Sequence, residues 1–153
     1  MSPAERLAGL GLTLPPVAAP VAAYVPAVRT GRYVYVSGQV PVVDGKLPAT
    51  GKVGGQVSVA DAAGLARTCV LNALAAAAAV AGGLNEITRI VKVTGFVASA
   101  PGFNGQPQVV NGASELLIEV FGEAGRHARS AVGVAELPLD APVEVELIAE
   151  VRD

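Results

Sequence analysis

The segment 58–83, SVADAAGLARTCVLNALAAAAAVAGG, constrains the fold more than any other part of the chain. Alanine is the best helix former, and no proline interrupts the segment. Ser58 is a favoured N-cap with Asp61 three positions on, as in a capping box, and Gly82-Gly83 supplies a C-terminal stop. The segment therefore predicts a helix whose small-residue face can lie close on a sheet. The residues predicted on that face are Leu65, Cys69, Ala73, Ala76 and Val80.

Alternating segments before and after this helix predict strands. RYVYVSGQVPVVDGKL (32–47) alternates tyrosine with valine, and its Asp44-Gly45 is typical of a hairpin turn with a short return strand. EITRIVKVTGFVAS (86–99) also alternates, as do the last two predicted strands at 128–137 and 141–151. Residues 109–125 have helical spacing. Together these segments predict an α+β fold, with a mixed sheet and two helices packed on one face.

The N-terminal region is predicted to differ from the rest. Residues 3–10 favour a short helix that ends near Gly11. The prolines that follow forbid helix and favour extended backbone; they are Pro15, Pro16, Pro20 and Pro26. With 153 residues and no composition change that marks a linker, we expect a single domain over 1–153.

Composition excludes several classes of function. The net charge is −2 with scattered basic residues, and there is no tryptophan, so we expect no nucleic-acid partner. One cysteine and one histidine leave no internal disulfide and no zinc or other metal site of the usual kind. The start of the chain lacks the features of a signal peptide, and the longest apolar run, LAAAAAVA at 74–81, is short for a membrane span. We therefore expect a cytoplasmic protein with no membrane partner.

The content of hydrophobic residues, 52%, is high for a monomer and suggests that another copy of the chain covers part of the surface.

Two reactive side chains favour structural interpretations. His127 is the only histidine, so a Ser-His-Asp triad would have to use it, but no partner is evident in the sequence. We interpret it as a solvated turn residue. Cys69 lies among leucine and alanine on the inner helix face, which predicts a buried, inert thiol.

Arg129 and the pair Glu144 and Glu146 leave alternatives open. Arg129 stands at the mouth of an otherwise apolar strand, where it is either a structural or solvated cation or a bidentate clamp for a substrate carboxylate. Glu144 and Glu146 share one strand face, which is either solvent-facing or the source of a carboxylate that orients a water.

Three motifs in combination resemble the RidA/YjgF family of small enamine and imine deaminases: YVYVSGQVP (33–41), RSAVGVAELP (129–138) and VEVELIAEV (143–151). The resemblance spans roughly residues 19–151. It implies a chorismate-mutase-like fold and a homotrimer with clefts at the subunit interfaces. It also implies hydrolysis of reactive 2-imino acids, such as 2-iminobutanoate and 2-iminopropanoate, to 2-keto acids and ammonia, without a cofactor.

The resemblance also assigns roles to residues. Arg129 would bind the substrate carboxylate, and Glu144 would position the attacking water. The residues that would contact the substrate are Tyr24, Ser37, Gly38, Asn111 and Ala131, the last at the position of the family's usual cysteine.

The chain departs from the family pattern at several points around this predicted cleft. It carries an extra segment at about 1–18, and its loop at 99–107 is longer than usual. Ser114 replaces an aromatic residue, and His127 replaces a proline. These departures indicate a divergent subgroup. Two alternatives to the deaminase therefore stay open: a non-catalytic trimer that binds a small carboxylate, chaperone-like or regulatory, and an endoribonuclease of the L-PSP type.

Overall fold

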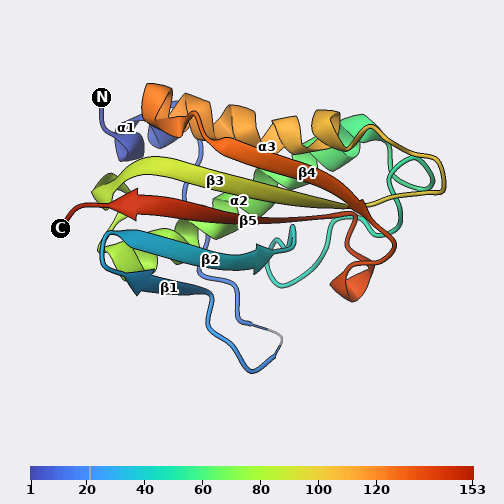
Figure 1. Ribbon diagram of the computed structural model, residues 1–153, viewed down its shortest axis with the longest axis horizontal. Coiled ribbons are helices and arrows are strands. Elements are labelled where there is room, and N and C mark those ends of the chain that lie inside the picture. The colour runs from blue at the N-terminus through green and yellow to red at the C-terminus, as the bar shows by residue number, and fades with distance from the viewer. Residues whose placement is uncertain (21) are drawn as a thin grey trace.

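The protein is built on one five-stranded sheet in the order β1-β2-β5-β3-β4 (Figure 1). It is described here from a computed structural model, which covers residues 1–20 and 22–153. Only the β3–β4 pair is parallel; the other neighbouring strands are antiparallel. The sheet is mixed, and helices α2 and α3 cover one face of it, as the sequence predicts. The strands are β1 (Ala27–Thr30), β2 (Tyr33–Gln39), β3 (Ile87–Ala98), β4 (Ala128–Val134) and β5 (Val143–Val151).

Helix α2 (Val59–Ala81) forms where it is predicted. The Ser58 side chain accepts a hydrogen bond from the Asp61 backbone N–H, and Gly82 ends the helix with φ of 95°. Val80 is exposed, which corrects its predicted place on the inner face; the buried face ends instead at Ala81. By length and composition α2 could cross a membrane, but more than half of its most apolar window is buried, because it is the core helix behind the sheet.

Helix α3 (Gln106–Phe121) begins three residues earlier than predicted, and residues 122–125 form a separate 3-10 turn. It packs tightly on α2. A Cβ at Gly112 would lie 2.0 Å from the Ala63 carbonyl oxygen, so only glycine allows the two backbones to approach this closely. This contact fixes the position of α3 and of the polar side chains that it carries.

The N-terminal region is anchored to the rest of the chain through its helix. Helix α1 (Pro3–Gly9) forms as predicted, and its capping box joins Ser2 and Glu5. Leu7 of α1 is buried, and the Ala4 N–H donates to Asn85 Oδ1 before β3. The chain then runs past α2 toward β1, as Figure 1 shows.

The hairpin of β2 differs from the prediction. Its partner is β1, across a turn at Gly31 with φ of 57°, and not the segment after Asp44-Gly45. That second turn closes only an isolated bridge between Val43 and Lys46. β1 has no clear alternation in the sequence, since Pro26 directly precedes it and its only buried side chain is Ala27.

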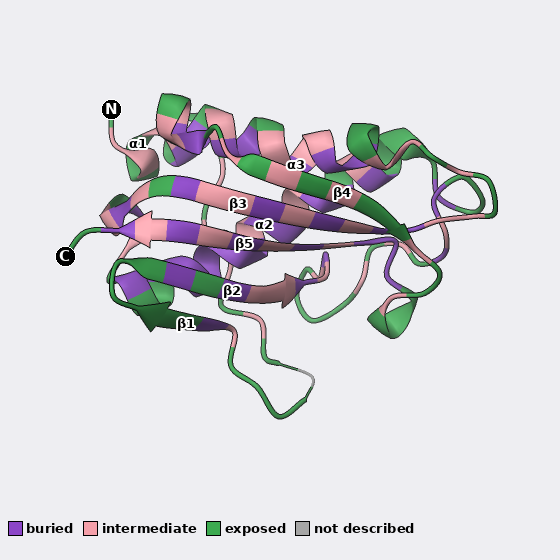
Figure 2. Ribbon diagram, viewed as in Figure 1, coloured by how far each residue is buried: buried purple, intermediate pink, exposed green. Residues whose placement is uncertain are grey.

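The two faces of the sheet have different neighbours (Figure 2). The helix side is apolar and buried, and includes Val34, Val36, Val143 and Val145. In β3 the simple alternation fails, because register shifts leave Ile87, Ile90 and Val93 all buried. The outer face exposes large side chains, namely Val28, Tyr33, Tyr35 and Val132.

Candidate functional site

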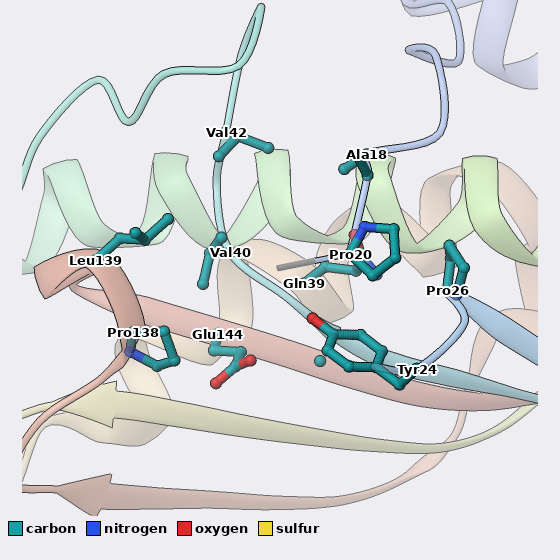
Figure 3. Close-up of a pocket in the computed structure, with 12 residues that line it drawn as sticks. Ala18, Pro20, Tyr24, Pro26, Gln39, Val40, Val42, Pro138, Leu139 and Glu144 are labelled. Atoms are coloured by element: carbon teal, nitrogen blue, oxygen red, sulfur yellow. The ribbon is translucent and has the colours of Figure 1, made fainter. Parts of the chain in front are cut away.

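A pocket of about 80 Å³ lies over β2 and β5 and contains the Glu144 side chain. Figure 3 shows the Glu144 carboxylate between Pro138 and the ring of Tyr24. Gly38 of β2 also lines it, so three of the predicted site residues, Tyr24, Gly38 and Glu144, meet here. The remaining lining is mostly apolar and comes from Ala18, Ala19, Pro20, Pro26, Gln39, Val40, Val42, Pro138 and Leu139.

Gly38 is required at its position by the Glu144 carboxylate. A Cβ on Gly38 would lie 2.4 Å from Glu144 Oε1, inside any real contact distance. The glycine thus makes the space in which the carboxylate sits. This gives a physical reason for the glycine of the S-G-Q motif.

Ser37 joins β2 to the segment that carries Tyr24 through two hydrogen bonds. Its hydroxyl donates to the Val25 carbonyl oxygen at 2.7 Å, and its backbone N–H donates to the Pro26 carbonyl oxygen at 2.8 Å. Both bonds fix the segment that carries Tyr24. The predicted contact of Ser37 with substrate stays a prediction, since its hydroxyl proton is already donated within the chain.

The electrostatics of the pocket make Glu144 a stronger proton acceptor than an ordinary glutamate. Burial raises the pKa of Glu144, and the charge of Glu146, two residues along the same strand face, raises it further. Because the folded pKa is higher than the unfolded one, the ionised carboxylate is less stable in the pocket than in water. It gains most from accepting a proton or a hydrogen bond there.

Arg129 lies in a different place, on β4 beside α3. Its Nη1 donates to Asn111 Oδ1 at 2.8 Å and to Ser114 Oγ at 3.2 Å, and its Nη2 donates to the Pro107 carbonyl oxygen at 3.5 Å. The structure thus joins two predicted residues, Arg129 and Asn111. The guanidinium is partly buried, and neutral oxygens of α3 compensate part of its desolvation.

His127 is not a solvated turn residue, and that interpretation is wrong. It is half-buried, its Nδ1 lies 2.6 Å from the Gly125 carbonyl oxygen, and its Nε2 lies 2.9 Å from Ser114 Oγ. Burial lowers the pKa of His127, and the Arg129 charge lowers it further, so the ring is neutral near neutral pH. Ser114, Arg126, His127 and Arg129, with Ile118, line a cavity of about 220 Å³.

The two predicted catalytic residues lie on opposite faces of the sheet. Arg129 pairs in register with Val93, which faces the helices, whereas Glu144 pairs with Phe96, on the outer face. One chain therefore carries two separate half-sites. The Glu144 half-site is over β2 and β5, and the Arg129 half-site is at the edge strand β4.

The remaining candidates behave as follows. Ala131 pairs with Gly95 on the helix side of β4 and packs against the core, on the same face as Arg129. Cys69 is fully buried, as predicted, and burial raises the pKa of its thiol well above the usual value, which keeps it protonated.

Comparisons with known proteins agree with this architecture. The family model described as "YjgF/chorismate mutase-like, putative endoribonuclease" matches residues 4–151. The protein TCP17 of Trypanosoma cruzi is 44% identical over 151 residues, which are 98% of this chain and 94% of that protein.

Two solved structures extend the comparison. A protein of unknown function from Agrobacterium tumefaciens is 48% identical with a TM-score of 0.88, over 98% of this chain and 92% of its own. TdcF of E. coli, solved with bound serine, is 31% identical with a TM-score of 0.64, over 92% and 94%. The full-length match, the mixed sheet and the S-G-Q and R-S motifs in their observed places lead to one conclusion: the chain belongs to the YjgF/chorismate mutase-like family, also called RidA/YjgF.

Proposed function

We propose that the protein is a hydrolase of 2-imino acids, which releases a 2-keto acid and ammonia. The observation that carries this proposal is the Glu144 carboxylate, seated over Gly38 beside Tyr24 in a largely apolar pocket. A carboxylate with a raised pKa is suited to orient a water molecule and accept its proton.

The chemistry needs little more than this. Water adds to the electrophilic imine carbon, and Glu144 takes the proton that the water loses. Starting from the protonated imine, the same proton then goes to the nitrogen of the resulting carbinolamine, so that the C–N bond breaks and ammonia leaves. As the C=O bond of the keto acid forms, the hydroxyl proton passes to Glu144, which releases it to ammonia or solvent and returns to its ionised form. Orientation of the two reactants supplies much of the acceleration. Neither a strong nucleophile nor a redox step is needed.

Arg129 supports the choice of an acid as substrate. An arginine can bind a carboxylate through two parallel N–H donors, which fixes both position and orientation. In this family TdcF has been solved with serine, which is itself a small amino acid with a carboxylate. The 2-imino acids that we propose as substrates share that carboxylate.

The proposed reaction requires two copies of the chain, because Arg129 and Glu144 lie on opposite faces of one sheet. A homotrimer with clefts between subunits, as the family resemblance implies, would bring the Arg129 half-site of one copy to the Glu144 half-site of the next. The exposed Tyr33, Tyr35 and Val132 on the outer face supply an apolar surface for such an assembly. We place this trimer in the cytoplasm.

The test is a coupled assay in which an amino-acid dehydratase generates 2-iminobutanoate in situ. We expect wild type to accelerate 2-oxobutanoate formation, and Arg129→Ala and Glu144→Ala each to lose about 100-fold or more of that acceleration. Arg67→Ala and Glu119→Ala are matched controls, because these two residues form an exposed ion pair at 3.1 Å on the helices. They should keep full activity.

Two other outcomes have a defined meaning. No acceleration by wild type, with thermal stabilisation by 2-oxobutanoate that Arg129→Ala loses, would favour a non-catalytic carboxylate-binding trimer. Cleavage of RNA at low salt that Glu144→Ala abolishes would favour the nuclease that the family description names.

A further inference from the structure

Two residues that depart from the family pattern, Ser114 and His127, are in direct contact. They are 13 positions apart in the sequence, on α3 and just before β4, and their side chains meet at 2.9 Å. Both line the cavity that contains Arg129. The hydrogen bonds that Ser114 and His127 make to their other neighbours determine which of the two donates to the other.

The direction of the hydrogen bonds follows from the acceptors. A carbonyl oxygen can only accept, so His127 Nδ1 carries the proton that is donated to Gly125 at 2.6 Å. In the neutral ring Nε2 is then an acceptor, and the Ser114 hydroxyl donates to it. A guanidinium can only donate, so Ser114 Oγ accepts from Arg129 Nη1 at 3.2 Å. The result is one chain of bonds from Arg129 through Ser114 and His127 to the Gly125 carbonyl.

This chain determines which edge of the guanidinium remains for a ligand. The two Nη1 protons are taken by Asn111 Oδ1 and Ser114 Oγ, and one Nη2 proton points to the Pro107 carbonyl oxygen. Of the five N–H donors of arginine, the Nε proton and one Nη2 proton remain, and they lie side by side on one edge when the Pro107 carbonyl oxygen takes the Nη2 proton that faces Nη1. Within residues 1–20 and 22–153 these two make no hydrogen bond to the protein.

We propose that Ser114 and His127 are positioning residues that lock the Arg129 side chain so that its Nε–Nη2 edge binds a carboxylate bidentately. The inference deepens the proposed function and rests on it for the identity of the carboxylate. His127 also acts as the acceptor that keeps the Ser114 hydroxyl pointed away from Arg129. If the ring faced Ser114 with an N–H, that hydroxyl would lose its acceptor.

The charged side chains that line the cavity together with His127 are two arginines. Arg129 faces it from β4 and Arg126 lines the same cavity, while Glu123 pairs with Arg126 at 3.1 Å. From β3, Arg89 reaches the Arg126 carbonyl at 3.5 Å. A second positive charge on the ring is therefore unfavourable, which agrees with a neutral His127 in the chain of bonds.

The first test uses the fact that the protein has one histidine. The ¹⁵N shifts of the ring, recorded at pH 8 where it is neutral, report its tautomer without assignment ambiguity. We expect the Nδ1–H form in wild type and in Arg67→Ala, and a shift toward a mixture in Ser114→Ala, which removes the donor to Nε2. A wild-type ring in the Nε2–H form would overturn the proposal.

The second test measures binding of 2-oxobutanoate, the stable keto acid, by calorimetry. Ser114→Ala and His127→Ala should each weaken binding about tenfold, since Arg129 loses its fixed orientation. His127→Gln should restore affinity to within about threefold of wild type, because an amide can accept from Ser114 and cannot be charged. Equal affinity in wild type, Ser114→Ala and His127→Ala would refute the positioning role.

These readouts separate the two proposals. Tautomer and binding need no turnover, so the positioning role stands if they behave as expected in a protein that does not hydrolyse imines. Conversely, an active wild type whose KM is unchanged in Ser114→Ala refutes the positioning role and leaves the hydrolase. If the wild-type protein does not bind 2-oxobutanoate, the claim that the Nε–Nη2 edge of Arg129 binds a carboxylate is refuted.

Discussion

At the scale of single residues, the close contact of Gly38 and Glu144 makes a sharp prediction. In Gly38→Ala the new methyl group would meet Glu144 Oε1 at 2.4 Å, so the carboxylate must move. The carboxylate is the far end of a flexible side chain, so we expect a loss of less than about 1 kcal/mol in the free energy of unfolding. We expect a loss of at least about tenfold in imine hydrolysis, because the carboxylate no longer reaches the water.

Denaturant unfolding and the coupled assay on the same preparation measure both effects, with Gly64→Ala as the control. Gly64 lies in α2 with nothing near its Cβ position. A Gly38→Ala protein with full activity would show that Glu144 does not need its observed place.

The sequence predicts which residues meet around Glu144 more completely than which meet around Arg129; the roles of both groups stay predictions. Tyr24, Gly38 and Glu144 fall in recognisable motifs, and the structure brings them together. The Ser114–His127 contact gives no such signal, because each residue alone is common at a helix surface or a turn. Only the packing of α3 on β4 brings them within hydrogen-bond distance.

At the scale of elements, the N-terminal region is a wall of the Glu144 pocket. Ala18, Ala19 and Pro20 line that pocket, and the region is anchored at its other end by Leu7 of α1. Removing the buried Leu7 side chain should loosen the anchor and admit water to the pocket. In Leu7→Ala we expect a loss of about 2 kcal/mol in stability and a fall of the Glu144 pKa toward its ordinary value.

The sign of the pH effect follows from that fall. Hydrolysis needs ionised Glu144, so its rate drops when pH falls below the Glu144 pKa, and a lower pKa moves this acid limb to lower pH. The pH–rate profiles of wild type, Leu7→Ala and Leu10→Ala test it, since Leu10 is 38% exposed in the same region. An acid limb that stays in place in Leu7→Ala would mean that the wall does not desolvate Glu144.

Element prediction succeeds where side-chain patterns are long and fails where they are short. α2 and β5 have strong periodicity and form as predicted. β1 has four residues of which one is buried, so its position depends on pairing with β2 and not on its own composition. The same holds for the first part of β3, where register shifts between Ile87 and Lys92 replace alternation.

At the scale of the whole molecule, the separation of the half-sites predicts that activity belongs to the assembly. Arg129→Ala and Glu144→Ala should each be inactive alone, but mixed subunits should regain activity. In a trimer with equal random mixing, each interface joins an intact arginine to an intact glutamate with a chance of one in four, so we expect ~25% of wild-type activity. Unfolding and refolding the two variants together, with native mass spectrometry to count subunits, measures this.

Refolding either variant with itself is the control for the mixing experiment. If the mixture stays inactive while trimers form, each active site takes both residues from the same subunit. That result would show that the trimer forms but that its active sites are not shared between subunits.

The position of β5 has a consequence for how the chain is made. β5 is the last strand in sequence, yet it lies between β2 and β3 at the centre of the sheet. While the ribosome is still extending the chain, β1 and β2 on one side and β3 and β4 on the other have no common partner. The place of β5 between β2 and β3 therefore stays empty until synthesis reaches residues 143–151. During that time the valine-rich edges of β2 and β3 have no native partner strand. We therefore expect chaperones to bind the nascent chain after β4 has been made and before β5 has been made.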